Sequence, residues 1–198
     1  MLKLYKIIIP FILIICTKGF AGDATTLIHE TLQVANTQLF SPNSIEVKLL
    51  QDCQETIPVL AQWIYDEWHT YDTTLTLEKA HSGFNKYLND DAMPFLIVAL
   101  KEGRPIGMIS LKALGEPEFA DLHDNNPWLS SFHVAPEERN KGLGQAMANI
   151  LLSIAQRLGY TKVHFYTSNP DNVPRYVKKG AGVVEKRPFR GHTVTIME

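Results

Sequence analysis

The sequence lacks long apolar runs, internal repeats and low-complexity segments, and it contains only two cysteines among 198 residues. Its longest apolar stretch, residues 7–16, is about half of the ~20 residues that a membrane-spanning helix requires. The absence of repeats and heptads excludes solenoids and coiled coils. What remains is a composition of 45% hydrophobic and 20% charged residues, which is typical of one globular domain with a buried core.

An excess of positive charge is also lacking, with 19 basic against 21 acidic side chains. Loss of residues 1–21 would remove Lys3, Lys6 and Lys18 and no acid, leaving 16 basic against the same 21 acidic side chains and a net charge near −5. This balance excludes a general nucleic-acid binder. Cys53 would then be the single cysteine, which excludes an internal disulfide, and we expect it to be a core residue rather than a nucleophile.

Residues 1–21 have the pattern of a secretory signal peptide. Lys3 and Lys6 precede the apolar run, and Gly19-Phe20-Ala21 places small residues where a signal peptidase would cleave. An uncleaved amino-terminal anchor and a buried apolar strand are the alternatives. The basic residues before the run predict an exported protein, periplasmic or secreted, with a cytoplasmic location as the alternative if the leader does not function.

Hydrophobic periodicity predicts an α/β fold in which antiparallel strands come first and a parallel strand-helix-strand crossover follows, with flanking helices. Residues 22–44 are expected to form an amino-terminal arm or short helix, and Ser41-Pro42-Asn43 separates this arm from a domain over 45–198. The expected strands are 45–50, 95–100, 105–111, 128–134, 163–167, 183–186 and 193–197. The expected helices are 53–69, 77–89, the long amphipathic 143–158 and a short one ending near 179.

Two glycines and two positive side chains occur together between a predicted strand and the longest predicted helix, in the stretch Arg139-Asn140-Lys141-Gly142-Leu143-Gly144. Helix amino termini present unpaired N–H groups that bind anions, and glycine lets the backbone approach a ligand closely. The stretch is not a P-loop, because no Gly-Lys-Ser or Gly-Lys-Thr follows, and it lacks the third glycine of a dinucleotide fingerprint. We therefore predict a loop that binds a pyrophosphate.

The arrangement Arg-x-x-Gly-x-Gly, after a strand that ends in Val-x-Pro, resembles the pyrophosphate-binding motif of the GCN5-related N-acetyltransferases (GNAT). Asn169 and Tyr176 stand seven residues apart, and residues 176–180 resemble the family's Tyr-x-Lys-x-Gly segment. The resemblance covers about residues 45–197 and is most specific over 128–180. It implies a GNAT-like mixed sheet, an N-acetyltransferase activity and acetyl-CoA as cosubstrate, with no metal.

The resemblance also implies a role for each matching residue. The backbone of Phe132 and Val134 would hold the pantetheine arm of CoA and polarise the thioester, and Asn169 would contact the same arm. An amine would attack directly in a ternary complex, and Tyr176 would act as the general acid that protonates the departing thiolate, with core packing as its alternative role. The residues that would hold the pyrophosphate are Arg139, Asn140, Lys141, Gly142, Leu143 and Gly144.

The last segment departs from the family's pattern at three positions. Asn172 stands where alanine is usual and Arg175 where an aromatic residue is usual, while Pro174 interrupts the helix that carries Tyr176. Proline is tolerated in a helix only in the first turn. We therefore expect this helix to begin late, near Val173 or Pro174.

Groups that could help to deprotonate an acceptor amine, or to bind it, occur at the end of the first predicted helix and before the central strand. For each of them a solvated surface position is the alternative. The central strand itself adds a hydroxyl on the face expected to carry the substrate. The candidates are Asp66, Glu67, His69, Asp121, His123, Asp124 and Ser130.

The remaining aromatic and histidine side chains carry weaker signals. In a regular strand His133 would point away from the face of Ser130, Phe132 and Val134, unless a bulge reverses it. The seven histidines show no metal-ligand spacing. Four aromatic residues of the first helix and its end are expected to be core or the lining of a substrate groove: Trp63, Tyr65, Trp68 and Tyr71.

Two functions follow from these residues. The first is an N-acyltransferase that moves an acetyl group from acetyl-CoA to a primary amine of a small molecule or peptide, and the acidic balance of the chain indicates a cationic acceptor. The alternative is a catalytically inactive acyl-CoA-binding protein or sensor, suggested by Pro174 and by the lack of an obvious base. We expect no nucleic acid and no membrane embedding of the mature domain. The arm 22–44 could pack on a second copy in a homodimer.

Export would separate the predicted enzyme from the cytoplasmic pool of acetyl-CoA. An exported protein would need delivery to a compartment that contains acetyl-CoA, such as a host cell, or a different donor.

Overall fold

The computed structural model of the chain describes residues 23–40, 44–89, 93–122 and 124–198. The predicted leader, 1–21, and the candidate His123 lie outside the described residues. Within the described part, no helix is both long enough and apolar enough to cross a membrane.

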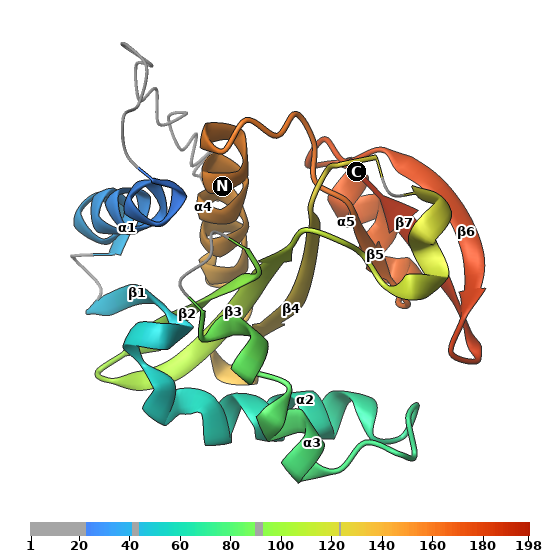
Figure 1. The fold of residues 1–198 in the computed structure, drawn as a ribbon, viewed down its shortest axis with the longest axis horizontal. Coiled ribbons are helices and arrows are strands. Elements are labelled where there is room, and N and C mark those ends of the chain that lie inside the picture. Colours follow the sequence, from blue (N-terminus) through green and yellow to red (C-terminus); the bar gives the residue numbers. More distant parts are fainter. Residues whose placement is uncertain (1–22, 41–43, 90–92, 123) are drawn as a thin grey trace, which may run out of the picture.

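Seven strands form two antiparallel sheets that lie side by side (Figure 1). The first sheet has the order β1-β2-β3-β4, and the second has the order β5-β7-β6. Every strand expected from the sequence is present, with small differences at the ends. The strands are β1 (Ile45–Leu49), β2 (Phe95–Lys101), β3 (Arg104–Lys112), β4 (Trp128–Val134), β5 (Phe165–Thr167), β6 (Val183–Phe189) and β7 (His192–Met197).

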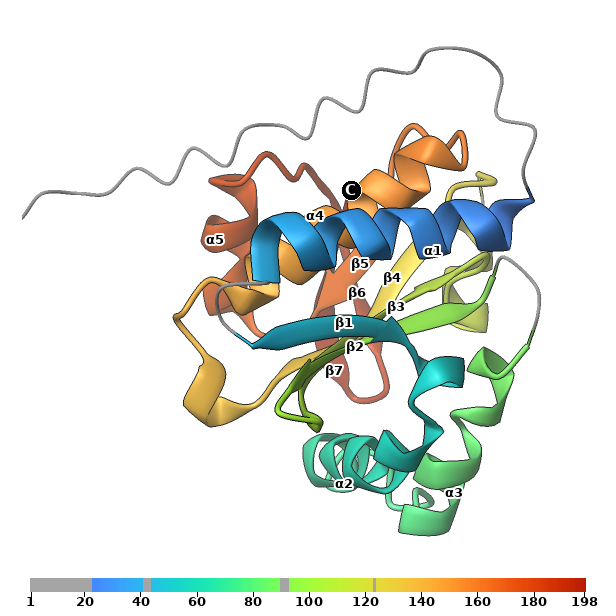
Figure 2. The ribbon, with the colours of Figure 1, turned by 90° about the vertical axis from the view of Figure 1, so that its left-hand side faces the viewer.

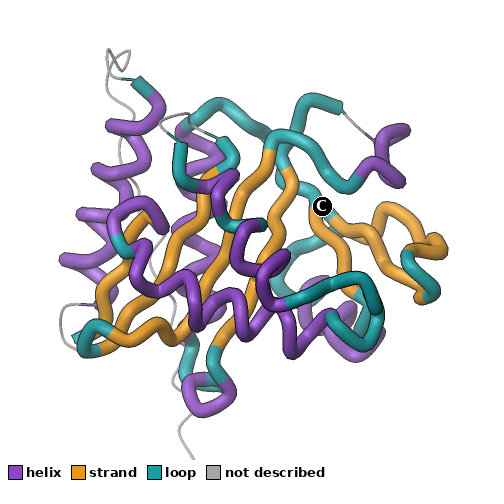
Figure 3. Tube along the Cα trace, turned by 60° about the horizontal axis from the view of Figure 1, so that its bottom comes forward, coloured by secondary structure: helices purple, strands orange, loops and turns teal. Residues whose placement is uncertain are grey.

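Helices cover both faces of the first sheet and produce three layers (Figure 2). One layer contains α1 (Ala24–Ala35) and α4 (Leu143–Arg157), and the opposite layer contains α2 (Ile57–Trp68) and α3 (Leu77–Ser82). Seen from the side of α2 and α3, these helices lie in front of the strands (Figure 3). The short α5 (Val173–Val177) packs on the second sheet through an edge-to-face contact of Tyr176 with Phe165.

The sequence of α4 explains its place in the fold. Its apolar residues recur every three or four positions, so that one stripe of the helix meets the sheet. Residues of this stripe share one core cluster with α1 and with β1 to β3. The buried positions of α4 are Leu143, Met147, Ile150, Leu151, Ile154 and Ala155.

The amino-terminal arm is a helix of this domain. α1 begins at the cap residue Asp23, whose carboxylate accepts a hydrogen bond from the Thr26 N–H at 2.8 Å. Leu27, Ile28 and Leu32 on α1 are buried in the same cluster as α4. The structure thus has a helix in this segment, and its apolar face packs within the chain itself.

Two predicted helices differ in extent from the expectation, and each difference has a local cause. The helix expected over 53–69 begins at Ile57, after 3-10 turns, because Pro58 fits only the first helical turn. The helix expected over 77–89 ends at Ser82, with Gly83 as its carboxyl-terminal cap residue, and only a 3-10 turn, Asn85–Tyr87, follows.

The two sheets are joined at a single point between β4 and β5. Trp128 and His164 form one parallel bridge, in which the Leu129 N–H donates to the His164 carbonyl and the His164 N–H donates to the Pro127 carbonyl, both at 2.8 Å. The predicted parallel crossover is therefore present. Past this bridge the described residues of β4 and β5 form no further ladder pair, so β4 has no strand partner on that edge.

Replacement of Leu151 by alanine tests the core between α4 and the first sheet. Leu151 is 0% exposed, so we expect Leu151→Ala to lower the free energy of unfolding by about 2–5 kcal/mol through lost burial and the cavity left behind. The neighbouring Leu152 is 46% exposed, and Leu152→Ala should change the free energy of unfolding by less than about 0.5 kcal/mol. Urea unfolding of both variants measures the difference, and equal losses would contradict the assignment of this stripe to the core.

Candidate active site

The loop between β4 and α4 has the geometry of an anion-binding site. Asn140 has φ 60° and Gly142 has φ 89°, a pattern in which successive backbone N–H groups line a concavity. Gly142 is also the amino-terminal cap residue of α4, and no side chain forms a capping hydrogen bond there. The first N–H groups of a 15-residue helix therefore lie open to a ligand, with the positive end of the helix dipole behind them.

The charged side chains of this loop hold it in place. Arg139 donates from Nε to the carbonyl oxygen of Val134 at 2.9 Å, which ties the loop to the end of β4. Glu138 is nearly buried and accepts hydrogen bonds from Lys101 at 3.0 Å and from Lys141 at 3.1 Å. These two hydrogen bonds, together with the charges of both lysines, hold the pKa of Glu138 below its usual range. The carboxylate therefore stays ionised and fixes Lys141 beside the open amides.

Gly144 allows α4 to approach β4 closely. A Cβ atom at this position would lie 3.2 Å from Cζ of Phe132 and 3.5 Å from Cγ2 of Val134. The amino terminus of α4 therefore lies directly against the part of β4 that the sequence assigns to the pantetheine arm. The structure brings together all eight residues predicted for this half of the site: Phe132, Val134 and 139–144.

A β-bulge beside this loop changes which side chains of β4 lie on each face of the sheet. Ser130 lies opposite Ser110 and His133 lies opposite Met108, so two residues of β4 face one residue of β3. Ser131, inside the bulge, has φ 50°. The bulge reverses the expectation for a regular strand: His133 shares the face of Ser130, whereas Phe132 and Val134 point to α4.

The bulge directs His133 toward α2. Its ring stacks on Trp63 with a centroid distance of 4.7 Å, and its Nε2 atom is buried without a hydrogen-bond partner among the described residues. Burial, and then the charge of Arg139, lower the pKa of His133, so the imidazole is neutral at pH 7.

On the other side of the site, Asn169 and Tyr176 follow β5. The side-chain oxygen of Asn169 accepts a hydrogen bond from the Asp171 N–H at 2.9 Å and caps a 3-10 turn. α5 then begins at Val173 with Pro174 in its first turn, which confirms the late start expected from the proline. Tyr176 is partly buried, and burial raises the pKa of its phenol, so it keeps its proton at neutral pH.

A cavity of about 220 Å³ lies beside the bulge, on the face of the first sheet that carries α2 and α3. Its wall comes from α2 and the segment after it, from β3 and β4, and from the second sheet. Only Ser130, Trp68 and Tyr71 among its residues are candidates from the sequence, because the others carry no motif and come from distant segments. They include Asp72, Lys86, Tyr87, Lys112, Glu116, Ser131, Tyr166, Ser168, Phe189, Arg190 and His192.

Hydroxyl groups gather where this cavity meets β4. The Tyr87 hydroxyl lies 3.2 Å from Oγ of Ser110 and 3.4 Å from Oγ of Ser131, and the hydroxyls of Ser110 and Ser130 are 2.8 Å apart. Burial opposes ionisation of Tyr87, but Lys86 and these hydroxyls outweigh it, so the pKa of the phenol lies below its usual value. This cluster supplies uncharged hydrogen-bonding groups to a molecule in the cavity.

The structure places the other candidates for the acceptor side outside the cavity lining. Asp66 accepts a hydrogen bond from Gln62 on the exposed side of α2, and His69 stacks on Tyr65. Asp121 pairs with Arg187 through two contacts of 2.8 Å.

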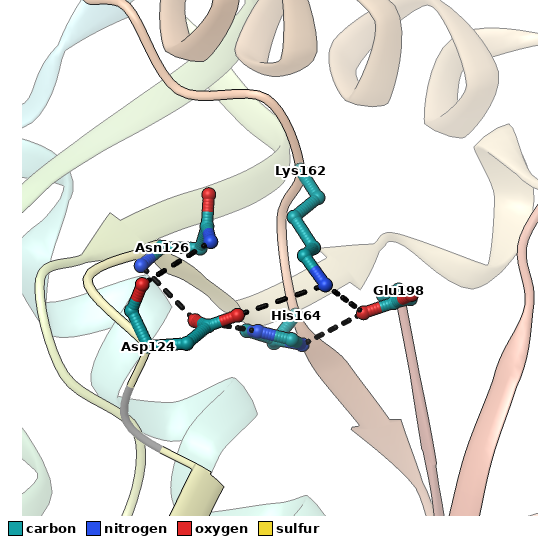
Figure 4. A network of polar contacts seen from close by, with 5 residues as sticks. All are labelled: Asp124, Asn126, Lys162, His164 and Glu198. Atoms are coloured by element: carbon teal, nitrogen blue, oxygen red, sulfur yellow. Dashed lines mark hydrogen bonds and ion pairs between the residues drawn. The ribbon is translucent and has the colours of Figure 1, made fainter.

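Asp124 belongs to a polar network at the bridge between the sheets (Figure 4). Its carboxylate lies 3.0 Å from Nε2 of the buried His164 and 3.7 Å from Nζ of Lys162. Lys162 also contacts the carboxylate of Glu198 at 2.9 Å. Burial acts against ionisation of Asp124, yet the hydrogen bonds from His164 and Asn126 prevail and lower its pKa to about 2. Asp124 thus fastens the loop before β4 to β5.

Two further features carry no chemistry that we assign to the reaction. An open depression of about 570 Å³ lies at the carboxyl-terminal end of α4, the end opposite the anion-binding loop. Cys53 is buried, donates to the Leu49 carbonyl and has a pKa raised to about 11 by burial, as expected for a core residue. In the part of the chain that the structure describes, no three His, Cys, Asp or Glu side chains form a group that could hold a metal ion.

The depressed pKa of Asp124 predicts a loss of stability in acid. Because the folded-state pKa, about 2, lies below the ordinary value of 3.8, this contribution is present above pH 4 and is lost as pH falls toward 2. We expect Asp124→Asn to lower Tm at pH 6 and to reduce the further fall of Tm between pH 4 and pH 2.5. Thermal unfolding followed by circular dichroism measures both slopes, and parallel Tm curves for the two proteins would contradict the prediction.

Comparisons with known proteins agree with this geometry. The sequence model of the acetyltransferase (GNAT) family matches residues 57–181. A comparison with curated protein sequences finds no match. Among solved structures, a GNAT-family acetyltransferase from Streptococcus pneumoniae is 16% identical with a TM-score of 0.56, covering 77% of this chain and 96% of its own.

Two other solved structures are similar to the same extent. An acyl-CoA N-acyltransferase from Pseudomonas aeruginosa is 16% identical with a TM-score of 0.54, covering 77% of this chain and 96% of its own. An aminoglycoside 6'-acetyltransferase type Ii is 12% identical with a TM-score of 0.58, covering 77% of this chain and 95% of its own. At these identities the structures establish the fold alone, whereas the sequence model covers more than half of the chain. The chain therefore belongs to the GNAT family of acetyltransferases.

Proposed function

We propose that the chain transfers the acetyl group of acetyl-CoA to a primary amine of a small molecule or peptide, by direct attack in a ternary complex. The observation that carries the proposal is the uncapped amino terminus of α4 packed against the unpaired end of β4. Together these elements offer an anion site and a strand edge that one extended ligand, such as CoA, could occupy at the same time.

Each part of acetyl-CoA has a proposed partner. The pyrophosphate lies against the amides of 139–144, with Arg139 and Lys141 beside them. The pantetheine arm follows the free edge of β4 at Phe132 and Val134, and Asn169 contacts it from the second sheet. The thioester then lies at the bulge, next to the cavity beside Ser130, where the acceptor amine binds.

The proposed reaction forms one bond and breaks one bond. The amine nitrogen attacks the thioester carbon, and the C–S bond breaks as the N–C bond is completed. Tyr176 donates its proton to the departing sulfur. The attacking nitrogen loses a proton to solvent, and solvent returns a proton to the Tyr176 phenolate. An alkyl ammonium with a pKa near ~10.4 must first be deprotonated, which costs about 4 to 5 kcal/mol at pH 7.

A catalytically inactive acyl-CoA-binding protein is the second candidate function. Its supporting observation is the absence of an assigned base: Asp66, His69, Asp121 and Asp124 make other contacts and do not line the cavity.

Two measurements on the purified full chain separate the candidates. Titration calorimetry with acetyl-CoA tests the nucleotide site, and release of CoA thiol in the presence of amines tests transfer, with the product identified by mass. We expect micromolar binding of acetyl-CoA and thiol release with at least one class of amine. Binding without release for every amine class would favour the inactive protein, and absence of binding would contradict both candidates.

Replacement of Tyr176 by phenylalanine tests the general acid. We expect Tyr176→Phe to lower kcat about tenfold to a hundredfold at pH 7, since proton donation by a positioned acid contributes about that much or more. The affinity for acetyl-CoA should not change. The loss should shrink above pH ~8.5, where a thiolate of ordinary pKa leaves without a proton.

The control variant for this test is Tyr160→Phe, at the far end of α4. It should keep the kcat of the unaltered protein. Unchanged kcat in Tyr176→Phe, or a loss that is the same at every pH, would assign Tyr176 to packing on Phe165 instead.

A further inference from the structure

The residues that line the cavity beside the bulge have a net positive charge, whereas the chain as a whole has a net negative charge. Among its described lining residues, Lys86, Lys112 and Arg190 are cationic, against the carboxylates of Asp72 and Glu116. The full chain, in contrast, carries a formal net charge of −2. The cavity is therefore a locally positive site in an acidic protein.

Two of these cations, Lys112 and Arg190, contact the same carboxylate, that of Glu116. Glu116 lies 2.8 Å from Nζ of Lys112 and 3.3 Å from a terminal nitrogen of Arg190. Burial acts against ionisation of Glu116, but Lys112 and then the charges of Arg190 and Lys86 outweigh it and lower its pKa. The single charge of Glu116 does not neutralise these three cations, and with Asp72 included the lining keeps an excess of one positive charge, which favours an anion in the cavity.

The second carboxylate of the cavity is engaged elsewhere. Asp72 accepts hydrogen bonds from the Thr74 N–H at 2.9 Å and the Thr74 hydroxyl at 2.7 Å, within its own turn. These donors hold Asp72 in its turn, from where its charge also acts on Arg190. The three cations of the lining therefore exceed its two carboxylates by one positive charge.

Aromatic side chains complete the wall and limit the size of the occupant. Tyr71 and His192 touch edge to face, with centroids 4.4 Å apart, and so connect the segment after α2 with the hairpin of β6 and β7. Trp68, Tyr166 and Phe189 supply apolar surface. The volume of about 220 Å³ corresponds to about seven water molecules in the liquid, which suits a metabolite of amino-acid size.

We propose that the acceptor is a small primary amine that also carries a carboxylate or a comparable anion on an apolar body. The anion lies toward Arg190, Lys112 and Lys86, and the amine lies toward Ser130 and Ser131 on β4. This inference rests on the proposed acetyl transfer and reverses the cationic acceptor indicated by the overall charge. The same positive groups also favour the neutral form of the attacking amine, because nearby like charge disfavours an ammonium ion.

Binding of matched acids and amides tests the anion preference without relying on turnover. The ligands are the N-acetyl derivatives of alanine, leucine and phenylalanine and the corresponding amides, titrated into the full chain in the presence of CoA. These ligands carry no amine, so amine ionisation does not enter the comparison. We expect at least one acid to bind about tenfold more tightly than its amide, as for a hydrogen bond to a charged group.

Two variants of the cavity should change this preference in opposite directions. Arg190→Gln removes a cation and should lower the ratio of amide Kd to acid Kd about fivefold or more, whereas Glu116→Gln removes the competing carboxylate and should raise it. A structural role for the Glu116–Arg190 contact would instead weaken binding of acid and amide alike in both variants. The control is Arg104→Gln, on a side chain that is 82% exposed at the turn between β2 and β3.

The outcomes distinguish this inference from the proposed function. Equal affinity for acid and amide in all three pairs, or no binding of any acid at millimolar concentration, overturns the anionic acceptor, even if other amines release CoA thiol. Preference for the acids without thiol release from any amine overturns the transfer reaction and leaves the anion site standing.

Discussion

The structure depends on a constraint on β4, which pairs with β3 on one edge, through a bulge, and leaves the other edge open. Unpaired backbone groups are costly when they are buried, so a strand cannot simply lose its neighbour inside a sheet. Here β4 pairs in parallel at one bridge, Trp128 with His164, and has no strand partner on that edge beyond it. The open edge lies beside the anion-binding loop, so the groups without a strand partner are those that a ligand can satisfy.

Hydrogen bonds of the residues around this bridge hold the two strands together. The backbone of His164 donates one hydrogen bond and accepts another across the bridge. Its side chain lies within hydrogen-bond distance of Asp124, which precedes β4. At the other end of β4, Arg139 in the following loop donates a hydrogen bond to the Val134 carbonyl. β4 is therefore fixed at both ends, and the bulge at Ser131 lies between these fixed points. Such an arrangement keeps the open edge at a defined distance from α4 and from α5.

The sequence predicted the local elements well because their causes are local. The stretch before Pro136 predicted the central strand, and Pro174 alone placed the start of the last helix. The anion-binding loop was also predictable, since its residues are contiguous. The bulge was considered only as an exception to a regular strand, because it arises in the pairing with β3, which the sequence of β4 alone does not specify. The cavity was not predictable either: Glu116 and Arg190 are 74 residues apart, and neither belongs to a motif.

The amino-terminal helix has one more contact, made by Asn36 at its end. Its side-chain amide donates to the Val47 carbonyl at 2.9 Å and accepts from the Val47 N–H at 2.7 Å, as a neighbouring strand would. The outer edge of β1 is thus partly occupied by the chain itself. At the opposite edge, β6 carries three consecutive charged residues, 185–187, and Pro188, which oppose further pairing. The two outer edges, at β1 and β6, therefore resist the addition of a strand from another chain.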